Sequence, residues 1–584
     1  MLTNSELSQE LRTLGNLLLI EGADDFRARR YARLADTIEA LSEDVDALHR
    51  RGELTRIDGV GESTAAVLTE YIETGTSALR QATETNVPAT LLDLLAISGI
   101  GPKTVQRLHQ EHGIENVDAL EQAIDDGKLH GMKGISAKME QKMRDGIARL
   151  RRRNVERPLY EVLRLGEQIG ETLNLVPEMS AIAPAGQARR GRELPRRVDL
   201  VAATENIGRA CVVLKRVGLG DGSPSRVVHG EFGGGFPVRI VLTPSNYFGV
   251  TWLRETSDRA HLEALNERAR DRDLPPLTED EAWGRLDEAA VYERLGLPWI
   301  PHECREGSEA LDRADAGSWP ALIAREDYRG DVHSHTTASD GVSTLDEMAD
   351  AAAALGYEYL AICDHSQAAA YANGLKIDRL RQQGDAIREV NERLDGSIRI
   401  LAGSEVDVLT DGALDFPDDV LADLDWVVAS VHSQFNLSEE RQTTRICRAM
   451  ENPYVRVVGH PTGRLLGIRD PYPVDVPALI EKAAETGVAL ELNSSPERLD
   501  LGADYCRLAR DAGVPISINT DAHRRESLDS IRFGLSVARR AWLEPENVVN
   551  TWSLERLLAF RSNVRPEASS GGSVQPSQGS GNET

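Results

Sequence analysis

Between residues 331 and 523, a histidine or a carboxylate stands at the end of one short apolar run after another. The runs have the composition of β-strands, and Ala- and Leu-rich stretches of helical period lie between them. The strand-like runs are 359–363, 398–401, 426–431, 455–458, 488–492 and 515–519, and the helical stretches include 344–355 and 476–486. With the segment around His333, seven strand-then-helix units predict a parallel barrel, in which groups at the carboxyl ends of the strands converge on one mouth.

Nine side chains in this pattern are candidate metal ligands. They are His333, His335, Asp340, His365, Glu405, His432, His460, Asp521 and His523. His333 and His335 are two residues apart on a strand-like segment, so both can point to one face and grip one cation. A single histidine would be explained more simply as a hydrogen-bonded core or surface residue, but all six histidines after His302 belong to this set. The recurrence favours a multinuclear metal site, and mixed imidazole and carboxylate ligands suit manganese, zinc or iron.

The region from about 331 to 561 resembles a PHP domain, the polymerase and histidinol phosphatase family. The family pattern H-x-H, D, H, E, H, H, D-x-H is matched at all nine positions. This resemblance implies a distorted seven-stranded barrel with two or three divalent ions, manganese or zinc being expected. It places His333, His335, Glu405 and Asp521 on a first ion, His432 and His460 with Glu405 on a second, and Asp340, His365 and His523 near a third. Catalysis is then expected to rest on His333, His335, Glu405, His432 and Asp521.

Adjacent divalent cations predict the chemistry of phosphoester hydrolysis, because they activate a bound water and stabilise the leaving oxyanion. Arg464 and Arg498 lie just beyond ligand-bearing runs and could hold a substrate phosphate. An ordinary solvated surface arginine explains either of them equally well.

The N-terminal region contains a different repeated motif. Residues 57–61 (I-D-G-V-G) and 97–101 (I-S-G-I-G) share the pattern apolar, polar, Gly, apolar, Gly, and residues 132–136 echo it more weakly. These motifs resemble helix-hairpin-helix motifs, whose backbone N–H groups hold a nucleic-acid phosphate without regard to the base. The predicted DNA-binding residues are Gly59, Gly61, Gly99, Gly101, Lys103 and Gly134, with Lys133 and Lys138 adding charge. A single motif of this kind would equally suit any glycine-containing helix connection.

The segment 26–31 (F-R-A-R-R-Y) resembles the helical start of a family X DNA polymerase, and the order of the motifs matches the bacterial and archaeal members with a C-terminal PHP domain. The resemblance implies an all-α helix-hairpin-helix region at 1–150 and an α+β palm and thumb of nucleotidyltransferase type at 151–325. An α/β PHP barrel is expected at 326–565. The Ser-, Gly-, Gln- and Pro-containing end, 566–584, is expected to be a disordered tail.

The predicted palm departs from this family. Family members hold two magnesium ions with three carboxylates, but here Arg197 and Arg239 stand at two of those positions and only Asp199 is acidic. A guanidinium stays protonated at any workable pH, so neither arginine can become a ligand. We therefore predict a palm that binds no magnesium and does not extend primers.

The formal net charge of −27 is unusual for a DNA-binding protein, and only eight of the 67 basic residues are lysine. Such a composition is typical of proteins in a salt-rich cytosol, although an ordinary acidic protein is the simpler alternative. Five cysteines without C-x-x-C spacing, and no signal peptide or apolar run long enough to span a bilayer, indicate a cytoplasmic protein.

Four functions remain open. The leading one is a DNA repair protein of base excision repair, whose PHP domain is a 3′-5′ exonuclease on gapped or primer-template DNA. The second is an active bifunctional polymerase and exonuclease, the third a small-molecule phosphatase, and the fourth a binding scaffold without turnover. The hairpin motifs argue against the third, and the complete ligand set argues against the fourth.

Overall fold

A computed structural model describes residues 4–39, 41, 44–97, 100–130, 132 and 135–561. The chain forms two compact units, Met1–Asn154 and Val155–Thr584.

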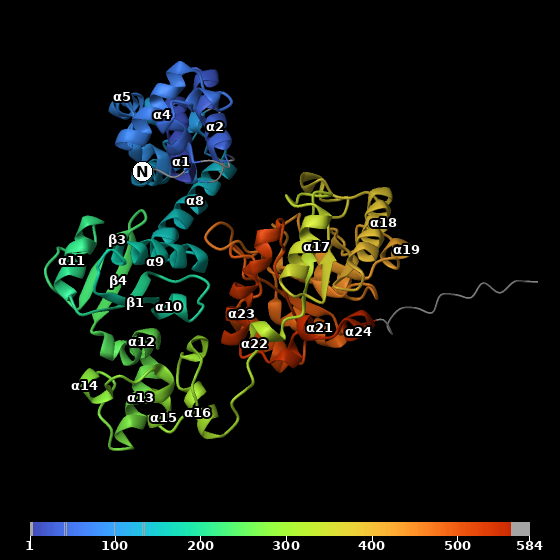
Figure 1. The fold of residues 1–584 in the computed structure, drawn as a ribbon. Helices are drawn as coiled ribbons and strands as arrows, with labels where there is room; N and C mark the ends of the chain where they lie inside the picture. The colour runs from blue at the N-terminus through green and yellow to red at the C-terminus, as the bar shows by residue number, and fades with distance from the viewer. Residues whose placement is uncertain are drawn as a thin grey trace, which may run out of the picture. The chain divides into compact units, whose positions relative to one another are not determined.

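Helices alone make up the described part of the first unit (Figure 1). They are α1 (Asn4–Glu21), α2 (Asp25–Glu39), α3 (Val45–Arg50), η1 (Leu54–Arg56), α4 (Glu62–Thr74), α5 (Ala78–Asn86), η2 (Ala89–Ala96), α6 (Pro102–His112), α7 (Val117–Asp125) and α8 (Ala137–Val155), where η denotes a 3-10 helix. Helix α1 contributes to two cores, because Leu11 and Leu14 pack with α2 and α4 while Leu17 and Ile20 pack with α6, α7 and α8.

The second unit begins with a four-stranded sheet in the order β1-β2-β4-β3. Its elements are α9 (Leu159–Leu173), β1 (Met179–Pro184), α10 (Gly186–Arg189), β2 (Val198–Thr204), α11 (Ile207–Arg216), β3 (Val227–Phe232) and β4 (Phe236–Thr243). Strands β2 and β4 are parallel, and the other neighbours are antiparallel. Every residue of β2 is buried, because Leu200 packs against α9 and α11 on one face while Val201 packs against Phe248 and Trp252 on the other.

A small helical subdomain follows this sheet. Its elements are η3 (Ser245–Tyr247), α12 (Phe248–Thr256), α13 (Arg259–Arg270), α14 (Asp280–Trp283), α15 (Glu288–Arg294), η4 (His302–Cys304) and α16 (Glu309–Asp315). Its core is formed around Trp283 and Tyr292, and it includes Trp542 from the C-terminal part of the chain. The buried His261 ring contacts the Tyr292 hydroxyl through Nε2 at 3.0 Å and the Gly307 carbonyl oxygen through Nδ1 at 3.1 Å.

The C-terminal part is a seven-stranded sheet in the order β11-β10-β9-β8-β7-β6-β5, with all neighbours parallel. The strands are β5 (Gly330–Ser334), β6 (Tyr359–Ile362), β7 (Arg399–Asp407), β8 (Trp426–Ser430), β9 (Val457–Val458), β10 (Ala489–Asn493) and β11 (Ile516–Asn519). The backbone N–H of His335 donates to the Ala522 carbonyl oxygen at 2.8 Å, which brings the first and last strands together in a nearly closed barrel.

Helices connect these strands. They are η5 (Arg325–Asp327), α17 (Leu345–Ala354), η6 (Ala370–Ala372), α18 (Ile377–Leu394), α19 (Asp418–Leu421), α20 (Glu439–Met450), α21 (Val476–Thr486), α22 (Ala503–Asp511), η7 (Arg525–Ser530), α23 (Ile531–Arg540), η8 (Pro545–Asn547), η9 (Val549–Thr551) and α24 (Leu554–Ala559). The strand-then-helix alternation predicted from sequence is therefore present through the whole barrel.

One strand is longer than the sequence predicted. The run 398–401 was expected to end before Glu405, but β7 continues to Asp407 and carries Glu405 inside it. The strand can continue because its first half pairs with β6 and its second half, from Gly403, pairs with β8. A Cβ atom at Gly403 would stand 2.9 Å from both the Cys363 Sγ and the Trp426 carbonyl oxygen, so this exchange of partners requires glycine.

A loop that precedes β2 is anchored on the barrel by ion pairs. The Glu193 carboxylate accepts from the Arg540 guanidinium at 2.9 Å and from the Ala503 backbone N–H at 3.2 Å. Arg540, on α23, also lies 3.5 Å from Glu306 and is only 6% exposed in its side chain. The buried Arg540 of the barrel therefore has two carboxylate partners, Glu193 from the loop before β2 and Glu306 from the helical subdomain.

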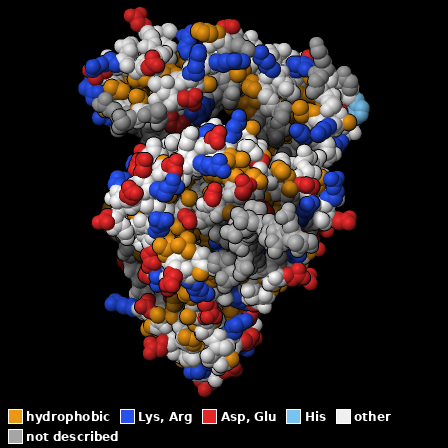
Figure 2. All heavy atoms as spheres, turned by 90° about the vertical axis from the view of Figure 1, so that its right-hand side faces the viewer, with side chains coloured by type: hydrophobic (Ala, Val, Ile, Leu, Met, Phe, Trp, Pro, Cys, Tyr) orange, Lys and Arg blue, Asp and Glu red, His pale blue; other side chains and the backbone are white. Residues whose placement is uncertain are grey.

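All five cysteines are free. Within the described residues, no helix combines the length and the apolar character needed to cross a bilayer. On the face drawn in Figure 2, acidic side chains are interspersed with basic ones instead of gathering in a single field. The expected disordered tail lies outside the described residues.

Candidate metal centre and nucleic-acid interface

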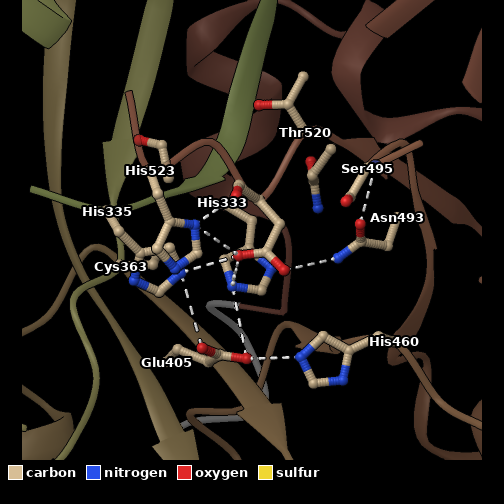
Figure 3. Close-up of polar contacts among 12 residues, drawn as sticks. His333, His335, Cys363, Glu405, His460, Asn493, Ser495, Thr520 and His523 are labelled. Atoms are coloured by element: carbon tan, nitrogen blue, oxygen red, sulfur yellow. Dashed lines mark hydrogen bonds and ion pairs between the residues drawn. The ribbon is translucent and has the colours of Figure 1, made fainter. Parts of the chain in front are cut away.

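The nine predicted ligands come together in the barrel, and Glu405 lies close to five of the histidines. Figure 3 shows Glu405 with His333, His335, His460 and His523. Its carboxylate is 2.9 Å from His365 Nδ1, 2.9 Å from His460 Nε2 and 3.3 Å from His432 Nε2. The Nε2 atoms of His333 and His335 lie 3.5 and 3.6 Å from the same carboxylate. Because β7 pairs with β6 on one side and with β8 on the other, Glu405 can reach histidines from strands on both sides.

The ligand atoms form three overlapping groups, in each of which all atoms lie within 4.8 Å of one another. The groups are His333, His335 and Asp521; His365, Glu405 and His432; and His335, Asp340, His365 and His523. The first and third resemble the predicted ligand sets, whereas the second pairs Glu405 with His365 in place of His460. The arrangement can hold more than one divalent metal ion.

The ionised carboxylates and the imidazole nitrogens of this site suit divalent cations. Burial alone would raise the pKa of the Glu405 carboxyl, but the imidazoles of His432 and His365 hold this pKa well below its usual range. The Asp521 carboxyl behaves likewise, with His333 as the principal opposing charge. The Nε2 atoms of His333 and His335 are buried and, within the described chain, have no hydrogen-bond partner. Ionised carboxylates beside unused imidazole nitrogens are the donor set that a divalent ion requires.

Two supporting carboxylates escaped the sequence analysis. Glu491, buried on β10, accepts from His333 Nδ1 at 2.7 Å and from the His460 backbone N–H at 2.7 Å. Asp407 lies 3.2 Å from His432 Nδ1. Each carboxylate orients an imidazole so that its other nitrogen faces the metal cluster. The available signal was an acidic residue inside an otherwise apolar strand, in A-L-E-L-N and S-E-V-D.

The two candidate phosphate-binding arginines lie in different surroundings. Arg464 donates to the carbonyl oxygens of Arg498 and Leu499, so its guanidinium is used by the backbone. The Arg498 guanidinium instead lies beside the candidate metal ligands, with its Nε 3.5 Å from Asp521 Oδ2. The position of Arg498 therefore suits a phosphate contact, and that of Arg464 does not.

Arginines also surround the single acidic residue of the predicted palm site. Asp199 on β2 lies opposite Arg239 on β4. Arg197 Nε donates to Asp199 Oδ1 at 2.8 Å, and Arg239 Nη1 donates at 2.6 Å to Glu255, a residue of α12 that the sequence analysis did not single out. Burial raises the pKa of Asp199, although Arg197 opposes the shift. The site is an internal ion-pair network.

Two further arginines at the end of α10, Arg189 and Arg190, also form contacts within the protein. Arg189 donates two hydrogen bonds to Glu288, at 2.6 and 2.7 Å. Its guanidinium lies 3.3 Å from the centre of the Trp252 ring. Arg190 donates to the Thr256 carbonyl oxygen at 2.6 Å and to Glu306 at 2.9 Å.

Two glycine hairpins in the first unit each lead into a helix. Gly61 and Gly101 are the N-cap residues of α4 and α6, and neither cap contributes a side-chain hydrogen bond. A Cβ atom at Gly59, Gly61 or Gly101 would meet no protein atom within 4 Å. Lys103 lies in the first turn of α6. Gly99, Lys133 and Gly134 lie outside the described residues.

Three family models match separate parts of the chain. Residues 2–77 match the family model "Helix-hairpin-helix domain", residues 91–149 match "SAM-like Helix-hairpin-helix tandem", and residues 331–495 match "PHP domain". The "DNA polymerase/3'-5' exonuclease PolX" of Bacillus subtilis (strain 168) is 34% identical over 565 residues, covering 94% of this chain and 98% of the relative. The chain belongs to the family X DNA polymerases that carry a C-terminal PHP domain.

Other relatives of this family X chain match a smaller share of it. A "Probable phosphatase" of Syntrophotalea carbinolica is 32% identical over 241 residues, which are 39% of this chain and 94% of the relative. A probable phosphatase of Thermoanaerobacter sp. (strain X514) is 31% identical over 238 residues, 38% of this chain and 89% of the relative. The predicted family and fold class are confirmed, because helical hairpin regions, an α+β region and a seven-stranded PHP barrel follow one another.

Proposed function

We propose that the PHP barrel of this chain is a metal-dependent phosphodiesterase that removes nucleotides from the 3′ ends of DNA during repair. The observation that carries this proposal is the convergence of nine imidazole and carboxylate side chains, one of which is Glu405, in the barrel. The name of the Bacillus subtilis relative, which includes a 3′-5′ exonuclease, supports the choice of substrate.

Divalent ions bound here would lower the pKa of a water molecule and stabilise the charge that develops on the leaving oxygen. The residues proposed to act in catalysis are His333, His335, Glu405, His432 and Asp521, and the full ligand set adds Asp340, His365, His460 and His523. Glu491 and Asp407 hold His333 and His432 in orientation. Manganese or zinc suits this mixture of nitrogen and oxygen ligands.

Hydrolysis forms a bond from a water oxygen to phosphorus and breaks the bond to the 3′ oxygen of the preceding nucleotide. That oxygen takes up a proton from solvent, and a 5′ mononucleotide is released. Arg498, beside Asp521, can contact the phosphate.

DNA would be held by the hairpins of the first unit. Gly61 and Gly101 present uncapped helix N-termini beside open space, where a phosphate can approach backbone N–H groups. Such contacts depend less on bulk positive charge than a basic groove would, which fits a chain of net charge −27. We place the protein in the cytoplasm, since free cysteines suit a reducing compartment.

We further propose that the palm does not synthesise DNA. Arg197 and Arg239 surround Asp199 with permanent positive charge, so two magnesium ions would lack both ligands and a favourable field. The second candidate is a bifunctional polymerase and exonuclease, which the name of the Bacillus subtilis relative favours. A small-molecule phosphatase is the third, favoured by the names of the relatives that are called probable phosphatases.

One experiment separates these functions. Primer-template DNA labelled at the 5′ end of the primer is incubated with manganese, with and without deoxynucleotides, at several salt concentrations. Shortening that disappears in both His333→Ala and Asp521→Ala supports the proposal. Primer growth would favour the bifunctional enzyme, and hydrolysis of a phosphomonoester without any change in the DNA would favour the phosphatase.

A further inference from the structure

An exposed tyrosine lies beside the metal cluster and plays no part in holding it. Tyr371 belongs to the short helix η6, in the loop that follows His365. Its ring centre lies 6.2 Å from that of His365 and 6.3 Å from that of His432, yet the residue is 71% exposed. The two histidines are 4% and 8% exposed, in the whole residue and in the side chain respectively. The tyrosine therefore presents an aromatic surface to solvent at the edge of the site.

The loop that carries Tyr371 is held at both ends. The Asp415 carboxylate accepts from the Ala368 backbone N–H at 2.7 Å. Beyond the tyrosine, Asn373 has a φ of 54° and donates through Nδ2 to the Ala338 carbonyl oxygen at 3.1 Å. Ala372, next to Tyr371, is buried. Such anchoring fixes the backbone, so the exposed ring is presented in advance of any ligand.

A cationic group borders a different part of the same cluster. Arg498 lies 3.5 Å from Asp521, whereas Tyr371 adjoins His365 and His432. Within the described chain, Arg498 Nη1 is buried and has no hydrogen-bond partner. An arginine with an unused N–H beside a metal cluster is suited to a phosphate oxygen. An aromatic face and a phosphate contact beside different ligands of one site suit the base and the phosphate of a nucleotide.

Building on the proposed exonuclease function, we propose that Tyr371 is a specificity-determining residue that stacks on the base of the 3′-terminal nucleotide while Arg498 contacts its phosphate. The site then selects nucleotide units over phosphate esters in general. Every base has a π-face, so recognition by stacking tolerates any sequence, as a trimming enzyme requires. A generic phosphate ester lacks the base and gains nothing from the tyrosine.

The test compares two primer-templates that differ only in the 3′-terminal unit, a normal nucleotide or an abasic tetrahydrofuran nucleotide. The full-length protein is assayed with manganese as wild type, Tyr371→Ala, Tyr371→Phe and a control, Tyr505→Ala, which removes a tyrosine 38% exposed on α22. Bound metal per chain is measured for each variant. Wild type, the control and Tyr371→Phe should remove the normal nucleotide with a kcat/KM roughly tenfold above that for the abasic unit.

In Tyr371→Ala the kcat/KM values for the normal and the abasic unit should be about equal, mainly because the KM for the normal end rises. The metal content should not change. A preference that survives in Tyr371→Ala, or an equal loss on both DNAs, would overturn the stacking role. Equal rates of wild type on the two DNAs would overturn it as well. If wild type shortens neither DNA, the exonuclease function itself fails and the proposal for Tyr371 fails with it.

Discussion

Arg239 lies opposite Asp199 on adjacent parallel strands, with 3.9 Å between its Nη1 atom and the Asp199 carboxylate. Arg197, the residue just before β2, lies 2.8 Å from the same carboxylate oxygen. Two guanidinium groups thus occupy the surroundings in which a polymerase of this family would hold magnesium. The pairing also connects the sheet to Glu255 on α12, so the network contributes to packing as well as to charge.

The first prediction concerns synthesis of DNA. In an Asp521→Ala background, where primers should not be shortened, we expect no template-directed extension with magnesium and deoxynucleotides, because Arg197 and Arg239 exclude the metal ions. Denaturing gels of a labelled primer measure this directly. Robust nucleotide addition that follows the template would contradict the assignment.

The second prediction concerns the central ligand. Glu405→Gln removes a negative charge that faces five histidines, so we expect loss of bound metal and a fall in hydrolysis of at least about a thousandfold. Metal analysis and exonuclease assays on the same preparations check this. The control Asp411→Asn changes an exposed carboxylate of the same barrel, and it should leave both values unchanged.

The third prediction concerns orientation of a ligand. Glu491→Gln weakens the charged hydrogen bond to His333 without touching the metal cluster, so metal affinity should fall about 10- to 100-fold. Titration with manganese, read as the concentration that restores half of the activity, provides the measurement. Glu485→Gln is the matched control, because Glu485 is exposed on α21. An unchanged titration in Glu491→Gln would contradict the role of this residue.

The fourth prediction concerns the hairpins. Gly61→Ala and Gly101→Ala each place a methyl group in open space, and the φ angles of −96° and −99° suit any residue. The doubly substituted protein should therefore fold normally but bind DNA roughly tenfold more weakly, because the methyl groups obstruct phosphate contacts with the helix N-termini. Fluorescence anisotropy at fixed salt measures the affinity. Gly384→Ala, on a helix of the barrel, should bind as wild type does.

The fifth prediction concerns acid stability. Burial lowers the pKa of His261 to about 4. Between about pH 6.5 and pH 4 this imidazole is therefore protonated in the unfolded chain and neutral in the folded chain. Stability from this residue is complete above that window and is lost as the pH falls. Between pH 7 and pH 5 the loss should be about 2 kcal/mol in the free energy of unfolding.

Urea unfolding at the two pH values, followed by tryptophan fluorescence, tests this loss. His261→Gln should show a smaller difference between the two pH values than wild type. The control His229→Gln replaces an exposed histidine of β3, and it should show the wild-type difference. Equal differences in all three proteins would refute the role of His261.

The barrel and the convergence of the nine candidate ligands could be predicted, because each candidate stands at or near the end of a strand-like run in the sequence. The supporting residues carry no such mark. Glu491 lies inside the apolar run of β10 and meets His333 only when strands distant in sequence come together. Glu255 meets Arg239 through the packing of α12 against the sheet, which no local pattern encodes.

Two arginines show a further limit of sequence reasoning. Arg464 and Arg498 both lie just beyond strands of the barrel, so spacing along the chain predicts a phosphate contact equally well for each. Their loops orient them differently, since Arg464 bonds to carbonyl oxygens of the neighbouring loop while Arg498 extends to Asp521. Side-chain direction within a loop depends on contacts that form only in the folded chain.

The ion pairs of Arg540 show how the barrel depends on the segment that precedes it. This barrel residue has its charge balanced by Glu193 and Glu306, which both lie outside the barrel. A barrel cut free at residue 326 would lose both carboxylates and leave the Arg540 cation unmatched. The segment before the barrel therefore balances a buried charge of the barrel, in addition to any chemistry of its own.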